Sequence, residues 1–311
     1  MKKSLGLFDV YAICTGAMFS SGFFLLPGLA AAQTGPSVAL AYLVAGILML
    51  PAMFSMAELA TAMPRAGGDY FFLDRAMGPL VGTVGGIGTY LALALKSAFA
   101  LIGMGAYLAL FVQIDDIRPV AIGLTVLFTL LNIIGAKEST GIQRLLVAVL
   151  VSVMGFFIIS GLVMVASGAG NTAVVSDTPF LSAGFGGFLG TVGFVFVSYA
   201  GLTKIASVSE EVINPGRNIP LGMMLSIIST TIIYVIGIGI MTLLLPPDVF
   251  QSSLTPVADA AEVVLGFLPG QVGVILIVLS AVAAFASTGN AGILAASRYP
   301  LAMGRDGLLP R

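Results

Sequence analysis

The chain has 311 residues, of which 58% are hydrophobic and only 9% are charged, and its formal net charge is −1. A soluble domain of this length would not contain so many long runs without an ionisable group, so the composition indicates an integral membrane protein. The near-zero net charge argues against nucleic acid as a partner, and the lack of histidine together with a single cysteine, Cys14, argues against an enzyme or a metal centre.

Eight apolar segments are long enough to cross a lipid bilayer, which takes about 20 residues per helix. The start of the chain can also be read as a secretory signal, because an apolar run separates Lys2 and Lys3 from Ala30-Ala31-Ala32, but Asp9 and the length of that run favour a first membrane helix. The polar stretch 63–80 is expected to lie along the inner interface as a short amphipathic element, and 168–185 and 246–262 are expected to be outer loops. The predicted spans are 7–29, 38–62, 81–112, 118–135, 143–167, 186–209, 219–245 and 265–300.

The basic residues between these spans predict the orientation in a cell membrane, either a plasma membrane or a bacterial inner membrane. With the N-terminus in the cytoplasm, Arg118 is the single basic residue in an outer loop. Positive charge on the cytoplasmic side is the usual arrangement of multi-pass proteins, which supports this orientation. The basic residues assigned to the cytoplasmic side are Lys2, Lys3, Arg65, Arg75, Lys137, Arg144, Arg217, Arg298, Arg305 and Arg311.

Two of the predicted spans contain residues that favour an interruption of the helix. Ser20-Ser21-Gly22 lies in the first span and Ser198-Tyr199-Ala200-Gly201 lies in the sixth; serine competes for backbone hydrogen bonds, and glycine adopts unusual dihedral angles. An interrupted helix persists in a membrane where it is buried in protein or lines a polar cavity. Its free N–H groups suit a carboxylate and its free carbonyls suit an ammonium group or a sodium ion, so two matching interruptions predict a site for a free amino acid. The alternative is that these small residues only allow close helix packing.

Four stretches of the chain resemble the amino acid–polyamine–organocation (APC) superfamily of permeases, from about residue 5 to the last residue. They are Ser20-Ser21-Gly22-Phe23-Phe24-Leu25-Leu26-Pro27; Ala57-Glu58-Leu59 with Pro64-Arg65-Ala66-Gly67-Gly68-Asp69-Tyr70; Ser209-Glu210-Glu211-Val212-Ile213-Asn214-Pro215-Gly216-Arg217-Asn218-Ile219-Pro220; and Ala295-Ala296-Ser297-Arg298 with Gly304-Arg305-Asp306-Gly307-Leu308-Leu309-Pro310.

The resemblance implies an all-α integral membrane protein with two five-helix repeats of inverted topology and with discontinuous helices one and six. Residues 1–167 would form the first repeat, and residues 186–311 would form part of the second. Because the family fold needs ten helices and eight are predicted, we expect the chain to be a fragment of a longer permease.

The resemblance also implies roles for individual residues. The amides of Ser21 and Gly22 would hold the substrate carboxylate, and the carbonyls of Met18, Val197 and Ala200 would hold its ammonium group. Family members often carry an aromatic lid where Val197 stands, so the lid is expected to come from a neighbour such as Phe196 or Tyr199, or to be missing. The remaining residues of the expected substrate site are Ser20, Phe196, Ser198, Tyr199 and Gly201.

A sodium site is a further expectation from the resemblance. In sodium-coupled relatives, two adjacent hydroxyl residues join carbonyls of the first span, and here these are Ser287 and Thr288, after Ala284, with Gly16 and Phe19. Proton-coupled relatives place a lysine from span five in that space, and span five here has only Arg144 at its entrance, which favours sodium. The alternative is that Ser287 and Thr288 bond to carbonyls one turn earlier in their own helix.

Two lysines lie within predicted spans, where ionisable groups are costly. Lys96 lies about 20 Å into the third span at 1.5 Å per residue, so we expect it to face the interior and to carry a coupling proton, contact the substrate or bond to carbonyls of an interrupted helix. Lys204 lies nearer the cytoplasmic end, where snorkelling or an ion pair with Glu211 would account for it.

Together these patterns predict a secondary transporter of amino acids or related amines, coupled to sodium or protons, with alternating access to the two faces of the membrane. Its expected partners are a small amino acid substrate and the lipid bilayer, and apart from the sodium ion no cofactor is expected. The alternatives are a non-transporting membrane subunit or nutrient sensor on a permease scaffold, and a channel, which would need a continuous polar stripe through several helices.

Overall fold

A computed structural model describes residues 3–111, 116, 118–134, 136–169 and 179–308, and within them the regular structure is helical apart from one isolated bridge between Leu5 and Val212. Lys2, Arg311 and residues 170–178 of the predicted outer stretch 168–185 lie outside the described residues. The α-helices are α1 (Leu7–Met18), α2 (Ser21–Phe24), α3 (Leu26–Thr34), α4 (Val38–Ala62), α5 (Asp69–Met77), α6 (Pro79–Leu108), α7 (Arg118–Ile134), α8 (Ala136–Met164), α10 (Gly184–Phe196), α11 (Pro215–Leu244), α12 (Pro247–Ser252), α13 (Pro256–Val264), α14 (Val272–Ala296) and α15 (Arg298–Arg305). The remaining helical segments are the 3₁₀ helix η1 (Gly35–Ser37), the π-helix η2 (Val165–Ala169) and the 3₁₀ segment η3 (Val197–Glu211).

The all-α membrane architecture predicted from the sequence is confirmed. In the described part of the chain, six helical stretches are long and apolar enough to cross a membrane, and α1 and α7 are shorter apolar helices. The difference from the eight predicted spans has a physical cause: the first span is divided after Met18, and α7 has only 17 residues. The six long stretches are Leu26–Ala62, Pro79–Leu108, Gly141–Gly168, Gly184–Glu211, Pro215–Leu244 and Val272–Arg305.

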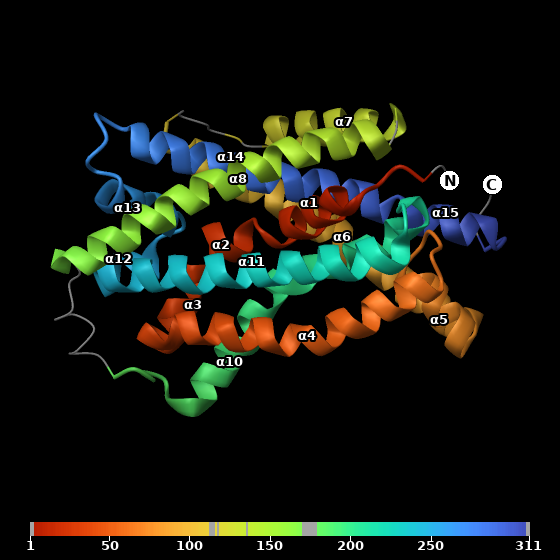
Figure 1. Cartoon of the computed structure of the whole chain (residues 1–311), viewed down its shortest axis with the longest axis horizontal. Helices are drawn as coiled ribbons and strands as arrows, with labels where there is room; N and C mark the ends of the chain where they lie inside the picture. The colour runs from red at the N-terminus through yellow and green to blue at the C-terminus, as the bar shows by residue number, and fades with distance from the viewer. Residues whose placement is uncertain (1–2, 112–115, 117, 135, 170–178, 309–311) are drawn as a thin grey trace.

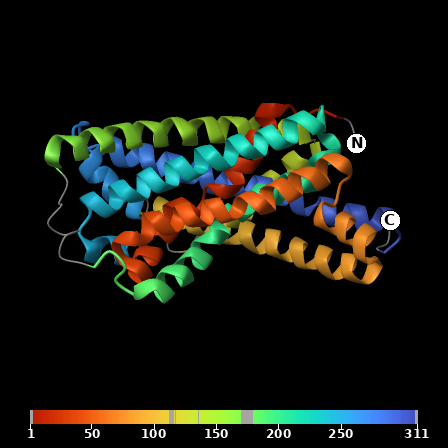
Figure 2. The same ribbon diagram turned by 60° about the horizontal axis from the view of Figure 1, so that its bottom comes forward.

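Figure 1 shows an elongated bundle whose long helices run along one axis, with both chain ends at the same end of the bundle. Helix α1 lies inside it and packs against α8, α11, α14 and η3. Helix α4 packs along α11, and α6 packs along α14; Figure 2 shows α4 and α11 running alongside each other in a second view. The interrupted first span is therefore surrounded by protein, which is the setting in which a broken membrane helix can persist.

Two polar stretches contain short helices, and one of them was predicted to be a loop. The predicted outer loop 246–262 contains α12 and α13, and each of them begins with a proline at its first or second position, where the missing N–H costs nothing. The predicted amphipathic element in 63–80 is α5, which buries Tyr70 and Phe72 and exposes polar positions. These short helices cap the ends of the bundle.

Three of the motif stretches meet at the end of the bundle that carries the termini. Arg298 donates to Glu211 Oε1 at 2.7 and 3.0 Å, and Arg305 donates to Glu210 Oε2 at 2.9 Å. The backbone N–H of Ala66 also donates to Glu210 Oε2, at 3.1 Å. These contacts tie η3 to α15 and to the loop before α5, so the end of the sixth span is held from two sides.

Candidate functional site

The first span is interrupted where the sequence predicts. Helix α1 ends at Met18, Phe19 is extended with ψ 124°, and Ser20 is extended with φ 175° and ψ −118°. A new helical turn, α2, begins at Ser21. Because two serines and a glycine follow one another here, the local sequence lowers the cost of leaving the helical conformation.

The sixth span changes its winding rather than opening into a gap. The α-helix α10 ends at Phe196, and the 15 residues of η3, from Val197, are wound as a 3₁₀ helix. Runs of 3₁₀ helix longer than three or four residues are uncommon because the hydrogen-bond geometry is poorer, and they often mark functional or strained segments. The predicted interruption at Ser198-Tyr199-Ala200-Gly201 lies in the first part of this segment.

The two irregular segments touch each other through glycines. A Cβ on Gly22 would lie 2.7 Å from Ser198 Cβ, and a Cβ on Gly201 would lie 2.2 Å from the carbonyl oxygen of Ala17. Neither position has space for a side chain, since real Cβ atoms do not approach other atoms so closely. Gly22 and Gly201 therefore allow the backbones of spans one and six to meet.

Buried tyrosines satisfy the carbonyls that the interruption releases. Tyr42 of α4 donates to the carbonyl of Gly22 at 2.7 Å, and Tyr234 of α11 donates to that of Met18 at 2.9 Å. Tyr199 donates to the carbonyl of Tyr42 at 3.0 Å, and Tyr107 of α6 donates to that of Phe24. Of these four tyrosines, Tyr199 alone was predicted from the sequence to belong to the site. A tyrosine in an apolar helix is a usable signal for the other three, because its hydroxyl needs an acceptor when buried.

A cavity of about 610 Å³ lies between the two irregular segments and one face of α6. Predicted site residues that line it are Ser21, Gly22, Lys96, Val197, Ser198 and Ala200. Other lining residues are Leu26, Gly88, Thr89, Ala92, Leu93, Leu95, Phe99, Thr203 and Lys204.

The other predicted substrate residues lie outside this lining. Met18, Ser20, Tyr199 and Gly201 are buried, and Phe196 is a partly buried residue packed against the core. Of the two predicted lid residues, Tyr199 points its hydroxyl to the carbonyl of Tyr42. The proposed aromatic lid stays a prediction.

Some polar side chains near the cavity have hydrogen-bond partners in the protein and others do not. Lys96 Nζ donates to the carbonyl of Val197 at 3.3 Å, and Thr203 Oγ1 donates to that of Ala200 at 3.2 Å. By contrast, the hydroxyls of Ser20 and Ser198 are buried without a hydrogen bond of regular geometry in the described part of the chain, and the hydroxyl of Tyr42 neighbours that of Ser198. Of the two, Ser198 lines the cavity and Ser20 does not, so Ser198 is the hydroxyl that a substrate there could reach.

The expected sodium site is filled by hydrogen bonds within the protein. Thr288 Oγ1 lies 2.7 Å from the carbonyl oxygen of Gly16 and 2.8 Å from that of Phe19, and donates to them. Gln143 of α8 donates its amide to Ser287 Oγ at 2.6 Å and to the carbonyl of Ala12 at 3.2 Å.

An amide N–H is a donor, whereas sodium needs acceptors around it. A Cβ on Gly16 would lie only 2.3 Å from Gln143 Nε2, so the amide directly abuts the carbonyl-bearing turn of α1. The amide of Gln143 therefore opposes a sodium ion beside Ser287, and the sodium site stays a prediction. The sequence analysis looked for a lysine in span five and overlooked this glutamine.

The expected pairing of Lys204 with Glu211 is wrong. Glu211 pairs with Arg298 instead. Lys204 is 3% exposed, so it does not snorkel, and its Nζ has no hydrogen-bond partner among the residues that the structure describes. Lys204 lies instead at the cavity lined by α6 and beside Gly292 of α14. A spacing of seven residues brings two side chains to one face of an α-helix but not of a 3₁₀ helix, so Lys204 and Glu211 do not share a face of η3.

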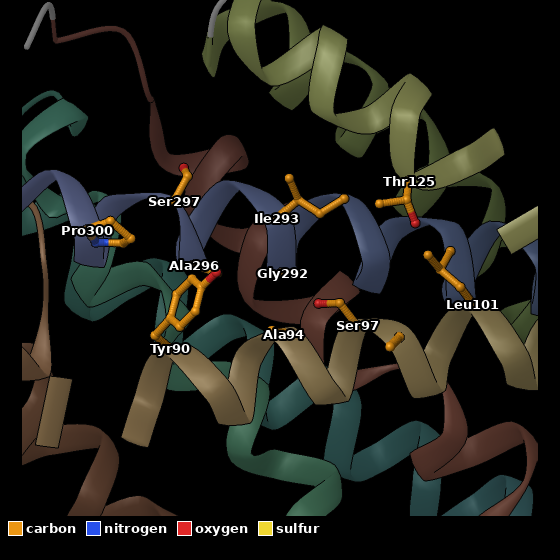
Figure 3. A pocket seen from close by; sticks show the side chains of 11 residues that line it. Tyr90, Ala94, Ser97, Leu101, Thr125, Gly292, Ile293, Ala296, Ser297 and Pro300 are labelled. Atoms are coloured by element: carbon orange, nitrogen blue, oxygen red, sulfur yellow. The ribbon is translucent and has the colours of Figure 1, made fainter. Parts of the chain in front are cut away.

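A second cavity, of about 490 Å³, lies on another face of α6. Figure 3 shows that α6, α7 and α14 surround it, with Ser97 pointing toward Gly292 and Tyr90 toward Ala296. It contains none of the predicted site residues. The first cavity is the better candidate because both irregular segments line it.

The chain is similar to known amino acid transporters. The chain is 28% identical to a branched-chain amino acid permease of Bacillus subtilis, covering 100% of this chain and 69% of the relative. It is 30% identical to the vacuolar cationic amino acid transporter 2 of Arabidopsis thaliana, covering 100% of this chain and 51% of the relative. The chain thus spans about half to two thirds of the length of such relatives, which are transporters and not enzymes. A match to the amino acid permease family extends over residues 5–311, and the chain belongs to that family.

Proposed function

We propose that the chain is part or all of a secondary transporter that carries amino acids or related amines and binds them between the two irregular segments. The observation that carries this proposal is their convergence on one cavity, which Ser21, Gly22, Val197, Ser198 and Ala200 line together. The buried hydroxyl of Ser198 at this cavity supports it. Relatives named as a branched-chain amino acid permease and a cationic amino acid transporter support amino acids as the substrate class.

The substrate carboxylate would accept hydrogen bonds from the amides of Ser21 and Gly22 and from the hydroxyl of Ser198. Its ammonium group would donate to the carbonyls of Val197 and Ala200. Each of these carbonyls accepts a side-chain hydrogen bond, from Lys96 and Thr203 respectively. The substrate ammonium group would replace these side-chain donors.

Proton coupling is the form of energy coupling that we favour. The hydrogen bonds around Ser287 and Thr288 oppose sodium at that position, and Lys96 is an ionisable group that lines the cavity. Alternating access would follow from movement of residues 186–311 against residues 1–167, the two proposed repeats. Both termini lie at one end of the bundle, in keeping with an even number of crossings in a cell membrane and a cytoplasmic N-terminus (Figure 1).

Uptake by liposomes containing the purified chain tests the proposal. Radiolabelled amino acids of neutral, acidic and basic type are offered with a proton gradient, with a sodium gradient and with neither. Saturable uptake that a proton gradient stimulates is the expected result. Binding without uptake under any gradient would instead identify a sensor or a non-transporting subunit, and neither binding nor uptake would refute the proposal.

A further inference from the structure

Two lysines from different elements line the cavity that we assign to the substrate. Lys96 comes from α6 and Lys204 comes from η3. The Nζ of Lys96 has a backbone carbonyl as its acceptor, whereas the Nζ of Lys204 is buried without a partner in the described part of the chain. The Lys204 amine lies beside α14, because a Cβ on Gly292 would be 3.4 Å from it.

No carboxylate in the described lining of this cavity compensates the two lysines. The two acidic residues at the end of η3, Glu210 and Glu211, bond to Arg305 and Arg298. Asp69 of α5 interacts with the lining residue Thr89, but Thr89 lies seven residues from Lys96, or about 10 Å along α6. Burial raises the pKa of Asp69, which favours its neutral form.

A buried lysine without a counter-ion favours its neutral amine, and an anion beside it stabilises the charged form, so the charge of the occupant matters in this cavity. The α-ammonium and α-carboxylate groups of an amino acid cancel each other, which leaves the side chain to decide. A basic side chain repels a protonated lysine, a neutral side chain gives neither lysine an ionic partner, and an acidic side chain supplies an anion. Lysine carries its ammonium group on a flexible four-carbon stem, so Lys204 can turn toward such an anion.

We infer that the substrate is an amino acid with an acidic side chain, whose side-chain carboxylate pairs with Lys204. This inference rests on the proposed function and narrows its substrate class. An acidic substrate would differ from the branched-chain and cationic amino acids that the names of the relatives specify. Lys204 is then a residue that determines specificity.

Uptake of radiolabelled L-glutamate, L-leucine and L-lysine by liposomes containing the whole chain tests the inference. L-glutamate is expected to enter at least about tenfold faster than L-leucine, a difference that one well-placed charge pair supplies, with L-lysine at background. Uptake of L-leucine or L-lysine with L-glutamate at background would overturn the inference and leave the proposed function standing. Absence of uptake for all three would instead count against the proposed function.

Variants of Lys204 give the second test. Lys204→Met is expected to lower the ratio of glutamate to leucine uptake about tenfold, and Lys204→Arg is expected to retain the preference because it keeps the charge. Arg118→Met, which removes an exposed charge far from the cavity, serves as the matched control. Should Lys204→Met not give monodisperse protein, Lys96→Met is measured in its place. An unchanged ratio in the folded variant would overturn the inference.

Discussion

Two regions on opposite sides of the first interruption differ in whether their buried polar atoms have hydrogen-bond partners. On the cavity side, Ser20, Ser198 and Lys204 carry buried polar atoms without a hydrogen bond of regular geometry in the described residues. On the side of α8 and α14, Gln143, Ser287 and Thr288 bond to one another or to the carbonyls of α1. The first region is prepared for a ligand, and the second holds the interrupted helix in place. One broken helix thus combines a binding surface with a fixed anchor.

The largest expected effect is a loss of folded protein, and it follows from a substitution at the contact between spans one and six. Gly201→Ala places a Cβ 2.2 Å from the carbonyl oxygen of Ala17, which is backbone and cannot move aside. We expect loss of monodisperse protein in size-exclusion chromatography. Gly155→Ala in α8, where nothing lies within 4 Å of the added Cβ, is the control and is expected to behave like the unmodified chain. A folded Gly201→Ala protein would contradict the described contact.

Substitutions in the region of Gln143, Ser287 and Thr288 are expected to lower the stability of the protein and to leave amino acid binding unchanged. Gln143→Leu removes two donors and leaves the buried carbonyl of Ala12 without this partner, at a cost of about 1–3 kcal/mol. Thermal unfolding in detergent is expected to show a lower Tm. Sodium is expected to leave the Tm of the unmodified chain unchanged, with potassium as the control salt, and a rise specific to sodium would show that the anchor region does bind this ion.

The tyrosines that satisfy the released carbonyls predict a smaller effect. Tyr234→Phe removes the hydroxyl that bonds to the carbonyl of Met18 and is expected to cost about 1 kcal/mol. The measurement is again the Tm, and Tyr90→Phe in α6, whose tyrosine is partly exposed to the surroundings, is the control. Equal melting temperatures for the two variants would mean that Tyr234 does not support the interruption.

The smallest effect on stability is expected on the cavity side. Ser198→Ala removes a buried hydroxyl without a hydrogen bond of regular geometry in the described part of the chain, so the Tm should stay the same or rise slightly, while amino acid affinity falls by about 1 kcal/mol, or roughly fivefold. Ser280→Ala is a matched control, since Ser280 in α14 also carries a buried unpartnered hydroxyl but does not line the cavity. If both variants bind amino acids equally well, Ser198 is not a substrate ligand.

The sequence predicted the features that depend on composition and local conformation. The bounds of α4 are those of the predicted span 38–62, because a long apolar run between polar stretches leaves little freedom in the register. The interruption at Ser20 follows from three consecutive residues with low helix propensity, so it was also predictable.

Features that depend on how helices rotate against one another were not predictable. Sequence analysis does not show which carbonyl a buried tyrosine such as Tyr234 reaches, or that Gln143 points toward α1. The 3₁₀ winding of η3 has no signature in hydropathy, and because of this winding Lys204 and Glu211 do not share a face of the segment. The prolines that begin α12 and α13 were a usable signal that the sequence analysis overlooked.

Protection of an engineered cysteine by substrate tests the central claim that amino acids bind between spans one and six. Cys14→Ala removes the single native cysteine, and Val197→Cys adds one at a cavity position that is 51% exposed. Labelling by a thiol reagent is followed with L-glutamate, L-leucine and L-lysine in parallel, and Ser252→Cys on the exposed helix α12 is the control. We predict that at least one amino acid slows labelling of the cysteine at position 197 and leaves the control unaffected. Equal labelling rates with and without every amino acid would contradict binding at this site.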